Sequence, residues 1–266
     1  MAMKRALCVG INAYPIPGAD LRGCVNDANA WAELLKGTFG FPKQYVQMLL
    51  DSEATKANIL DPLRSMLMMA ESGDILVFTN SSHGSYVPDT NGDEPEYDEV
   101  LCPYDIEDNA IIDDELYDLF QEHLKDGVRL TVILDNCHSG TGTRLAGDDK
   151  RTERFLDPRR WGQEIPENFD FRLAKPRESQ QRPESAMKEV LLAGCKDIEV
   201  SWDALIGGKF HGAMTQAAIE AIRGANGRLT YRQLHEQVTR KVEANGFDQH
   251  PQLEGSDENK GRLLFT

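Results

Sequence analysis

Short apolar runs rich in β-branched residues alternate along this chain with longer segments of helical periodicity. This alternation is typical of an α/β protein built around a mostly parallel sheet. The predicted strands are residues 6–11, 45–50, 75–79, 129–134, 189–193 and 262–265. The predicted helices are residues 24–36, 55–70, 113–124, 212–223 and 231–244. We therefore expect a single doubly wound domain in which helices cover both faces of a six-stranded sheet.

The composition excludes several classes of protein. A chain of 266 residues with 40% hydrophobic content can bury a substantial core, which excludes general disorder. The apolar run at the N-terminus is too short for a signal peptide, and no stretch approaches the roughly 18 apolar residues of a membrane span. The sequence thus predicts a soluble, unexported protein with no membrane partner.

The cysteines and the net charge narrow the choice of partners. The five cysteines are widely spaced and form no Cys-x-x-Cys pair, which argues against a disulfide framework or a zinc site and favours a reducing cytoplasm. The formal charge is −15, so a nucleic-acid backbone would be repelled. A basic peptide or a divalent cation is a better partner.

Two segments do not follow the alternation of strands and helices. Residues 144–188 contain several prolines and a concentration of Arg and Lys, whereas residues 87–98 are acidic. A connection as long as 144–188 inside a compact domain is usually a functional loop or a disordered linker. We interpret it as a long loop between two halves of the sheet.

A His and a Cys follow two of the predicted strands. His83 comes after strand 75–79 and Cys137 after strand 129–134, so both should lie at one edge of the sheet, where a ligand can bind. An imidazole within reach activates a thiol by taking its proton. A lone Cys at a strand end is more often a small buried hydrophobe, but the separation of 54 residues is close to the caspase spacing of about 50. The backbone N–H groups of Gly84 and Cys137 are candidates for an oxyanion hole.

The residues around this pair resemble a known family. Ser82-His83-Gly84-Ser85 is similar to the His-Gly motif, and Asp135-Asn136-Cys137-His138-Ser139-Gly140 to the Asp-x-Cys-x-Ser-Gly motif, of metacaspases and the related bacterial orthocaspases. Segments 6–14, 23–28 and 193–197 add to the resemblance. It implies a caspase-hemoglobinase fold in one domain, with a large part (1–143), a basic, flexible linker (144–188) and a small part (189–266). It also implies a peptidase that cleaves after Arg or Lys.

The resemblance assigns catalytic roles residue by residue. It implies that His83 is the general base and acid, and that Cys137 is the nucleophile that forms a thioacyl intermediate. His138 is a lesser alternative base, since adjacent side chains at a strand end usually point apart. Ser82 and Asn136 depart from the usual family residues, yet both are small and neither change removes a reactive group.

Cleavage after a basic residue requires an acidic pocket, because an unpaired cation is costly to bury. Asp27 and Asp135 match positions that line the S1 pocket in the family, with Cys24 and Ser81 beside them. Asp197 is a further candidate from the second half of the chain. Alternatively, Asp27 caps a helix and Asp135 caps a loop.

The basic linker suggests regulation by proteolysis. An Arg-specific peptidase with an Arg-rich linker can cut itself or be cut by a partner protease, and the hypothesis is that this cleavage changes activity. The candidate positions are Arg151, Arg154, Arg159, Arg160, Arg172, Lys175, Arg177, Arg182 and Lys188. The alternative is a solvated, mobile loop without regulatory meaning.

Calcium is the cofactor that the resemblance implies. Asp98, Asp113 and Asp114 match three carboxylate positions that bind Ca²⁺ in the family, and oxygen ligands of this type suit the ion. The fourth matching position is Arg144, whose charge weakens the site unless Asp148 or Asp149 substitutes. Alternatively, the acidic residues 113–115 simply favour the start of the following helix.

The sequence as a whole favours a cysteine endopeptidase with Arg or Lys preference. Its partners would be protein or peptide substrates, with an activating protease or regulator in addition. A separase-like or gingipain-like peptidase of the same fold is the nearest rival. From a different class, an inactive caspase-like module would bind peptides or act as a scaffold, although the presence of both His83 and Cys137 argues against it.

Overall fold

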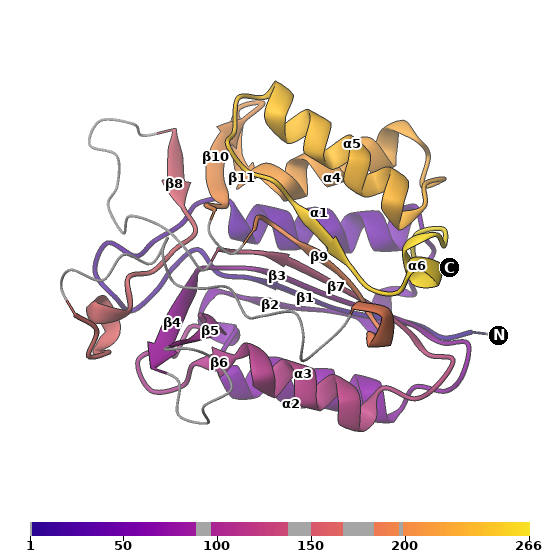
Figure 1. The fold of residues 1–266 in the computed structure, drawn as a ribbon, viewed down its shortest axis with the longest axis horizontal. Helices are drawn as coiled ribbons and strands as arrows, with labels where there is room; N and C mark the ends of the chain where they lie inside the picture. The colour runs from indigo at the N-terminus through magenta and orange to yellow at the C-terminus, as the bar shows by residue number, and fades with distance from the viewer. Residues whose placement is uncertain (1, 89–96, 138–149, 167–183, 197–198) are drawn as a thin grey trace.

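A central sheet organises the computed structural model, which describes residues 2–88, 97–137, 150–166, 184–196 and 199–266. The strands of this sheet are β1 (Lys4–Gly10), β2 (Val46–Leu50), β3 (Ile75–Ser81), β7 (Arg129–Asp135), β9 (Val190–Ala193) and β12 (Gln252–Glu254). The six strands follow the order β12-β9-β7-β3-β1-β2 (Figure 1). Neighbours are parallel, except that β12 runs antiparallel to β9. The predicted six-stranded, mostly parallel sheet is confirmed.

Helices cover both faces of the sheet. On one face lie α1 (Cys24–Gly37), α4 (Ala213–Gly224) and α5 (Tyr231–Ala244), and on the other lie α2 (Lys56–Met68) and α3 (Asp113–His123) (Figure 1). Each of these helices was expected from the sequence, with ends that differ by at most two residues. The other described helical elements are α6 (Asp257–Lys260) and the short 3-10 turns Lys43–Tyr45, Asp51–Glu53, Pro158–Trp161 and Glu184–Ala186.

Local signals fix the start of two helices. Thr55 accepts the backbone N–H of Asn58 at the beginning of α2 (3.3 Å), and Thr230 accepts that of Gln233 at the beginning of α5 (3.2 Å). Such caps satisfy N–H groups that have no partner inside the helix.

Alternate side chains of β3 enter two different apolar cores. Leu76 and Phe78 pack in the core that includes residues of α2 and α3, whereas Ile75 and Val77 pack in the core that includes Trp31 of α1. A strand of a parallel sheet covered by helices is buried on both faces, which explains its continuous apolar sequence.

Two small sheets lie near the carboxyl ends of the central strands (Figure 1). One contains β4 (Gly84–Pro88), β5 (Tyr97–Leu101) and β6 (Ile111–Ile112), and the other contains β8 (Arg151–Glu153), β10 (Trp202–Ile206) and β11 (Lys209–Gly212). The chain enters β4 directly after β3, so this edge of the molecule is built from residues that follow the parallel strands.

The C-terminal strand predicted at 262–265 is wrong. The last strand of the sheet is β12, and Phe265 has a φ of 51°, which no strand residue adopts. Leu264 and Phe265 are fully buried, and the Phe265 ring meets those of Trp31 and Tyr231 edge to face. These apolar residues therefore fill the core as side chains instead of pairing as a strand.

The segment 144–188, expected to be a structureless loop, is partly regular. Its described residues include β8 and the turn Pro158–Trp161, in which Trp161 is buried.

No helix in the described parts of the chain is both long and apolar enough to cross a membrane.

Candidate active site

The parallel pairing of β3 and β7 brings the two predicted catalytic residues to one edge of the sheet. Ser81 and Asp135 are partners in the register of these strands, and His83 and Cys137 each follow two residues later. Both side chains are buried. The two loops are in close contact at Gly84, where a Cβ would lie 2.2 Å from the carbonyl oxygen of Cys137. No residue with a side chain fits there.

Hydrogen bonding fixes the tautomer of His83. Its Nε2 lies 2.7 Å from the carbonyl oxygen of Ala19, which can only accept, so Nε2 carries the proton. Nδ1 is therefore the basic nitrogen of the neutral ring, and it makes no hydrogen bond to any described residue. Burial lowers the pKa of His83 to about 4, against an opposing contribution from the backbones of Ala19 and Arg154. The imidazole is thus neutral at physiological pH.

Cys137 is also neutral in this state of the chain. Its thiol is fully enclosed, and burial raises its pKa well above the ordinary value. Its Sγ lies 4.0 Å from the carbonyl oxygen of Ser201. The thiol and the imidazole are therefore both uncharged and closed off from solvent.

The cover is a segment of the chain itself, which contains Arg154. The carbonyl oxygen of Arg154 accepts the N–H of Gly84 at 2.9 Å and the N–H of Cys137 at 3.4 Å. These are the two donors that the sequence predicted for an oxyanion hole. The carbonyl group of Arg154 therefore binds both of the loops that carry His83 and Cys137.

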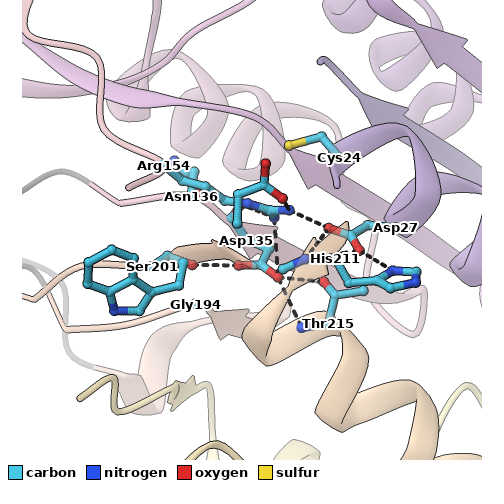
Figure 2. A network of polar contacts seen from close by, with 12 residues as sticks. Cys24, Asp27, Asp135, Asn136, Arg154, Gly194, Ser201, His211 and Thr215 are labelled. Carbon is cyan, nitrogen blue, oxygen red and sulfur yellow. Dashed lines mark hydrogen bonds and ion pairs between the residues drawn. The ribbon is translucent and has the colours of Figure 1, made fainter. Parts of the chain in front are cut away.

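The side chain of Arg154 is fully buried among three carboxylates. Its Nη2 lies 2.6 Å from Oδ2 of Asp27 and 3.6 Å from Oδ1 of Asp203. Its Nη1 lies 3.4 Å from Oδ2 of Asp135 and donates to the backbone carbonyl of Asp135 at 2.9 Å (Figure 2). The predicted pocket acids Asp27 and Asp135 thus face a guanidinium, and Cys24 lies buried beside them.

Residues from the small part of the chain hold Asp135 in place. Ser201 donates its hydroxyl to Oδ1 (2.6 Å), and Thr215 donates its hydroxyl (2.6 Å) and its backbone N–H (3.0 Å) to Oδ2 (Figure 2). Thr215 lies in the first turn of α4, where unpaired N–H groups favour an anion.

Asp27 is held at the same helix start. Its carboxylate accepts the N–H of Gly212 (3.0 Å) and lies 3.0 Å from Nδ1 of His211. A Cβ at Gly212 would lie 2.1 Å from Asp135 and 2.5 Å from the guanidinium of Arg154, so only glycine fits between them. The pocket is consequently assembled across both halves of the chain.

Asp203 is a pocket residue that the sequence analysis missed. It lies in β10, is fully buried and accepts the backbone N–H of Arg22 at 2.6 Å. Burial raises its pKa, against the opposing effect of Arg154. The available signal was an acidic residue inside the apolar run from Trp202 to Ile206.

The segment around Arg154 crosses the site in an extended conformation. β8 pairs with β10 in antiparallel register, and the N–H of Arg154 donates to the carbonyl of Ser201 at 2.9 Å. On the other side of Arg154, the N–H of Leu156 donates to the carbonyl of Gly84 at 2.9 Å. Backbone pairing on both sides of one residue is how extended peptides are commonly recognised.

Comparison with known proteins identifies the family. The model of the metacaspase peptidase C14 domain matches residues 4–146. The chain is 33% identical to metacaspase-1A of Aspergillus fumigatus over 99% of its own length and 71% of that protein. The chain belongs to the metacaspase family. Metacaspase-1 of Emericella nidulans is 32% identical, with 99% and 72% of the two chains covered.

Solved structures share the fold of this metacaspase. A protein from Geobacter sulfurreducens superposes with a TM-score of 0.73 at 28% identity, over 99% of this chain and 98% of that one. Caspase-1 from Spodoptera frugiperda superposes with a TM-score of 0.63 at 14% identity, over 96% and 87%, which shows a shared fold alone. The caspase-hemoglobinase fold is therefore confirmed, and the chain is a caspase-like cysteine peptidase by family.

Other predicted site residues of this metacaspase have different placements. Ser81 is buried at the end of β3, next in register to Asp135. Asp197 and His138 lie outside the described residues. Both Asp27 and Asp135 pair with Arg154, and both also accept backbone N–H groups at the start of α4, from Gly212 and Thr215 respectively.

The candidate cleavage positions differ widely in their surroundings. Arg151 lies over the ring of Trp202, Arg159 contacts Asp157, Arg160 donates to the carbonyl of Pro17, and Lys188 donates to that of Leu124. Arg172, Lys175, Arg177 and Arg182 lie outside the described residues. Arg154 is the described candidate whose carbonyl lies at the Gly84 and Cys137 N–H groups. The alternative prediction of a solvated loop is wrong at Arg154, because the guanidinium of this residue is buried and paired with carboxylates.

The predicted calcium ligands do not form a complete site by themselves. Asp98 lies in β5, and Asp113 and Asp114 begin α3. In the described parts of the chain, no three His, Cys, Asp or Glu side chains are grouped so that they could hold a metal ion. Arg144, Asp148 and Asp149 lie outside those parts.

Proposed function

We propose that this metacaspase is an endopeptidase that cleaves after Arg through His83 and Cys137. The observation that carries the proposal is the position of Arg154, whose side chain pairs with the pocket acids while its carbonyl accepts the N–H groups of Gly84 and Cys137. A substrate needs both interactions at once to present its scissile bond to the thiol. The chain thus holds a substrate-like segment in its own site.

The chemistry follows from the groups at that position. Nδ1 of His83 takes the proton of the Cys137 thiol, and the sulfur attacks the carbonyl carbon of the bound Arg. Negative charge that develops on the oxygen is stabilised by the two backbone N–H groups. The imidazolium returns the proton to the leaving amine, which leaves a thioester on Cys137. Water then hydrolyses the thioester and releases the carboxylate product.

The pocket geometry favours Arg over Lys. The two terminal nitrogens of the guanidinium address different groups, Nη2 the carboxylate of Asp27 and Nη1 the backbone carbonyl of Asp135. A planar fork reaches both at once, whereas the single ammonium of Lys is a point charge. We therefore assign the enzyme to substrates with Arg at the cleavage position, with Lys as a weaker alternative.

Self-cleavage at the Arg154–Phe155 bond is part of the same proposal. Cleavage would separate the segment that ends at Arg154 from the segment that begins at Phe155. Arg154 is fully buried in its own pocket, so a second molecule has no access to this bond in the intact fold. The cut is therefore made within one molecule, and its rate is independent of protein concentration.

Occupation of the site explains why the intact chain should be inactive toward other substrates. Arg154 already pairs with the pocket acids, and its carbonyl already accepts the N–H groups of Gly84 and Cys137, so another substrate cannot bind there. After cleavage the carboxyl end at Arg154 is free to leave, and water and substrates reach the dyad. The five cysteines are all unpaired and buried, which suits work in a reducing compartment such as the cytoplasm.

An Arg-aminocoumarin peptide and mass spectrometry together test the proposal. Wild type should release fluorophore and show a new C-terminus at Arg154, whereas Cys137→Ala should stay intact and inactive. Arg154→Ala should abolish that cut, and the matched variant Arg159→Ala should not. Wild type that hydrolyses no more peptide than Cys137→Ala, before and after proteolysis of the linker, would instead indicate a peptide-binding module.

A further inference from the structure

Phe155, the residue after Arg154, lies in an apolar site that the proposed function does not involve. Phe155 is only 5% exposed and packs in a small buried cluster with Tyr86, Ile165, Cys195 and the nucleophile Cys137. Its ring meets that of Tyr86 edge to face, with 6.4 Å between centroids. The environment next to the scissile bond on its amine side is thus specific for a large apolar side chain.

Backbone contacts fix the register of this residue. Phe155 pairs with Gly84 in a parallel bridge, between the N–H of Gly84 bound to the Arg154 carbonyl and the carbonyl of Gly84 bound to the Leu156 N–H. Any peptide that places a carbonyl at the N–H of Gly84 in this way directs its next side chain into the same cluster. The position of this apolar site is therefore fixed relative to the bond that would be cleaved.

Hydrolysis changes what this site can hold. When the Arg154–Phe155 bond breaks, water supplies a hydroxyl to the Arg154 carbonyl carbon and a proton to the Phe155 nitrogen. At neutral pH the new carboxyl group then gives up its proton and the new amine takes one up, so the two ends become a carboxylate and an ammonium. An ammonium is costly to keep in an apolar cluster, so the new N-terminus is driven toward water. Leu156 stays buried in the main core, so the movement is confined to the residue before it.

We propose that the apolar site filled by Phe155 in the intact chain is the S1′ subsite of the processed enzyme, and that it selects an aromatic or large aliphatic residue directly after the cleaved Arg. This inference rests on the proposed function and adds a second specificity determinant to the Arg pocket. Tyr86 and Ile165 are the walls that set its size. Acidic residues at this position are disfavoured because the cluster offers them an apolar environment.

Internally quenched peptides measure the preference directly. The processed enzyme is given peptides with the sequence of residues 151–154, Arg-Thr-Glu-Arg, followed by Phe, Leu, Ala or Asp and then Leu. Burial of a large apolar side chain predicts a kcat/KM about tenfold higher for Phe than for Ala, with Asp lowest. The aminocoumarin peptide, which has no amino acid after Arg, is the matched control.

Two outcomes are separable. Equal rates within about twofold across the peptides, or fastest cleavage before Asp, overturn the inference if the aminocoumarin peptide is hydrolysed. If that peptide is not hydrolysed either, the proposed function itself fails and the S1′ assignment falls with it. As a second measurement, Phe155→Leu should cleave itself at nearly the wild-type rate and Phe155→Asp at least about tenfold more slowly.

Discussion

Removal of the Arg154 guanidinium should destabilise the intact chain more than removal of any surface arginine. We consider Arg154→Ala in a Cys137→Ala background, in which neither protein can cut itself. The guanidinium is the counter-charge of Asp27, Asp135 and Asp203, whose side chains are 0%, 1% and 0% exposed. Loss of one partner of a buried ion pair leaves uncompensated charge and costs about 3 to 5 kcal/mol in the free energy of unfolding.

Urea denaturation of the two proteins measures this difference. Arg159→Ala in the same background is the matched control, because Arg159 pairs with Asp157 near the surface and should contribute about 1 kcal/mol or less. Burial raises the pKa of Asp203, and Arg154 opposes that rise, so loss of the guanidinium should move the folded-state pKa of Asp203 further above its unfolded value. The stability deficit of Arg154→Ala should therefore grow as the pH rises above about 4.

Chemical rescue adds a specific test of the pocket. Ethylguanidine supplies the missing cation, so millimolar concentrations should raise the urea midpoint of Arg154→Ala and leave that of the parent unchanged. Two results would refute the charge pairing in the pocket. One is an Arg154→Ala protein no less stable than the Arg159→Ala control, and the other is equal effects of ethylguanidine on both proteins.

Three other predictions concern the same site. Asp203→Asn should lower kcat/KM of the processed enzyme for an Arg peptide more than for a Lys peptide, because it removes a carboxylate beside Nη2; equal losses would contradict this role. Burial lowers the pKa of His83 to about 4, so the unfolded chain binds a proton at this residue more readily than the folded chain does. The free energy of unfolding should therefore fall by on the order of 3 kcal/mol as the pH falls from about 6.5 to about 4. Urea titrations of a His83→Gln variant should lack this dependence. EGTA should lower the peptidase rate if Asp98, Asp113 and Asp114 bind calcium with the help of further ligands, and an unchanged rate would count against the cofactor.

The sequence predicted the central parallel strands and the helices α1 to α5, and it placed His83 and Cys137 after two neighbouring strands. Apolar strands alternate with helices, and His83 and Cys137 follow two runs that are buried as neighbouring parallel strands. Strand ends are local features, and parallel neighbours present their carboxyl ends at one edge, so proximity of the two residues follows from the pattern. The motifs of the family resemblance also supplied Asp27 and Asp135, which lie beside Arg154 in the structure.

Tertiary structure alone decided what fills the site. Nothing near Arg154 in the sequence separates it from the other basic residues of the linker, and Asp203 belongs to no motif. The C-terminal residues Leu264 and Phe265 carried a strand-like pattern but entered the core as side chains. Each of these outcomes depends on charge pairing or packing between segments far apart in the chain. The desolvation cost of burying a guanidinium is offset here by three carboxylates from different elements, and these come together only in the folded chain.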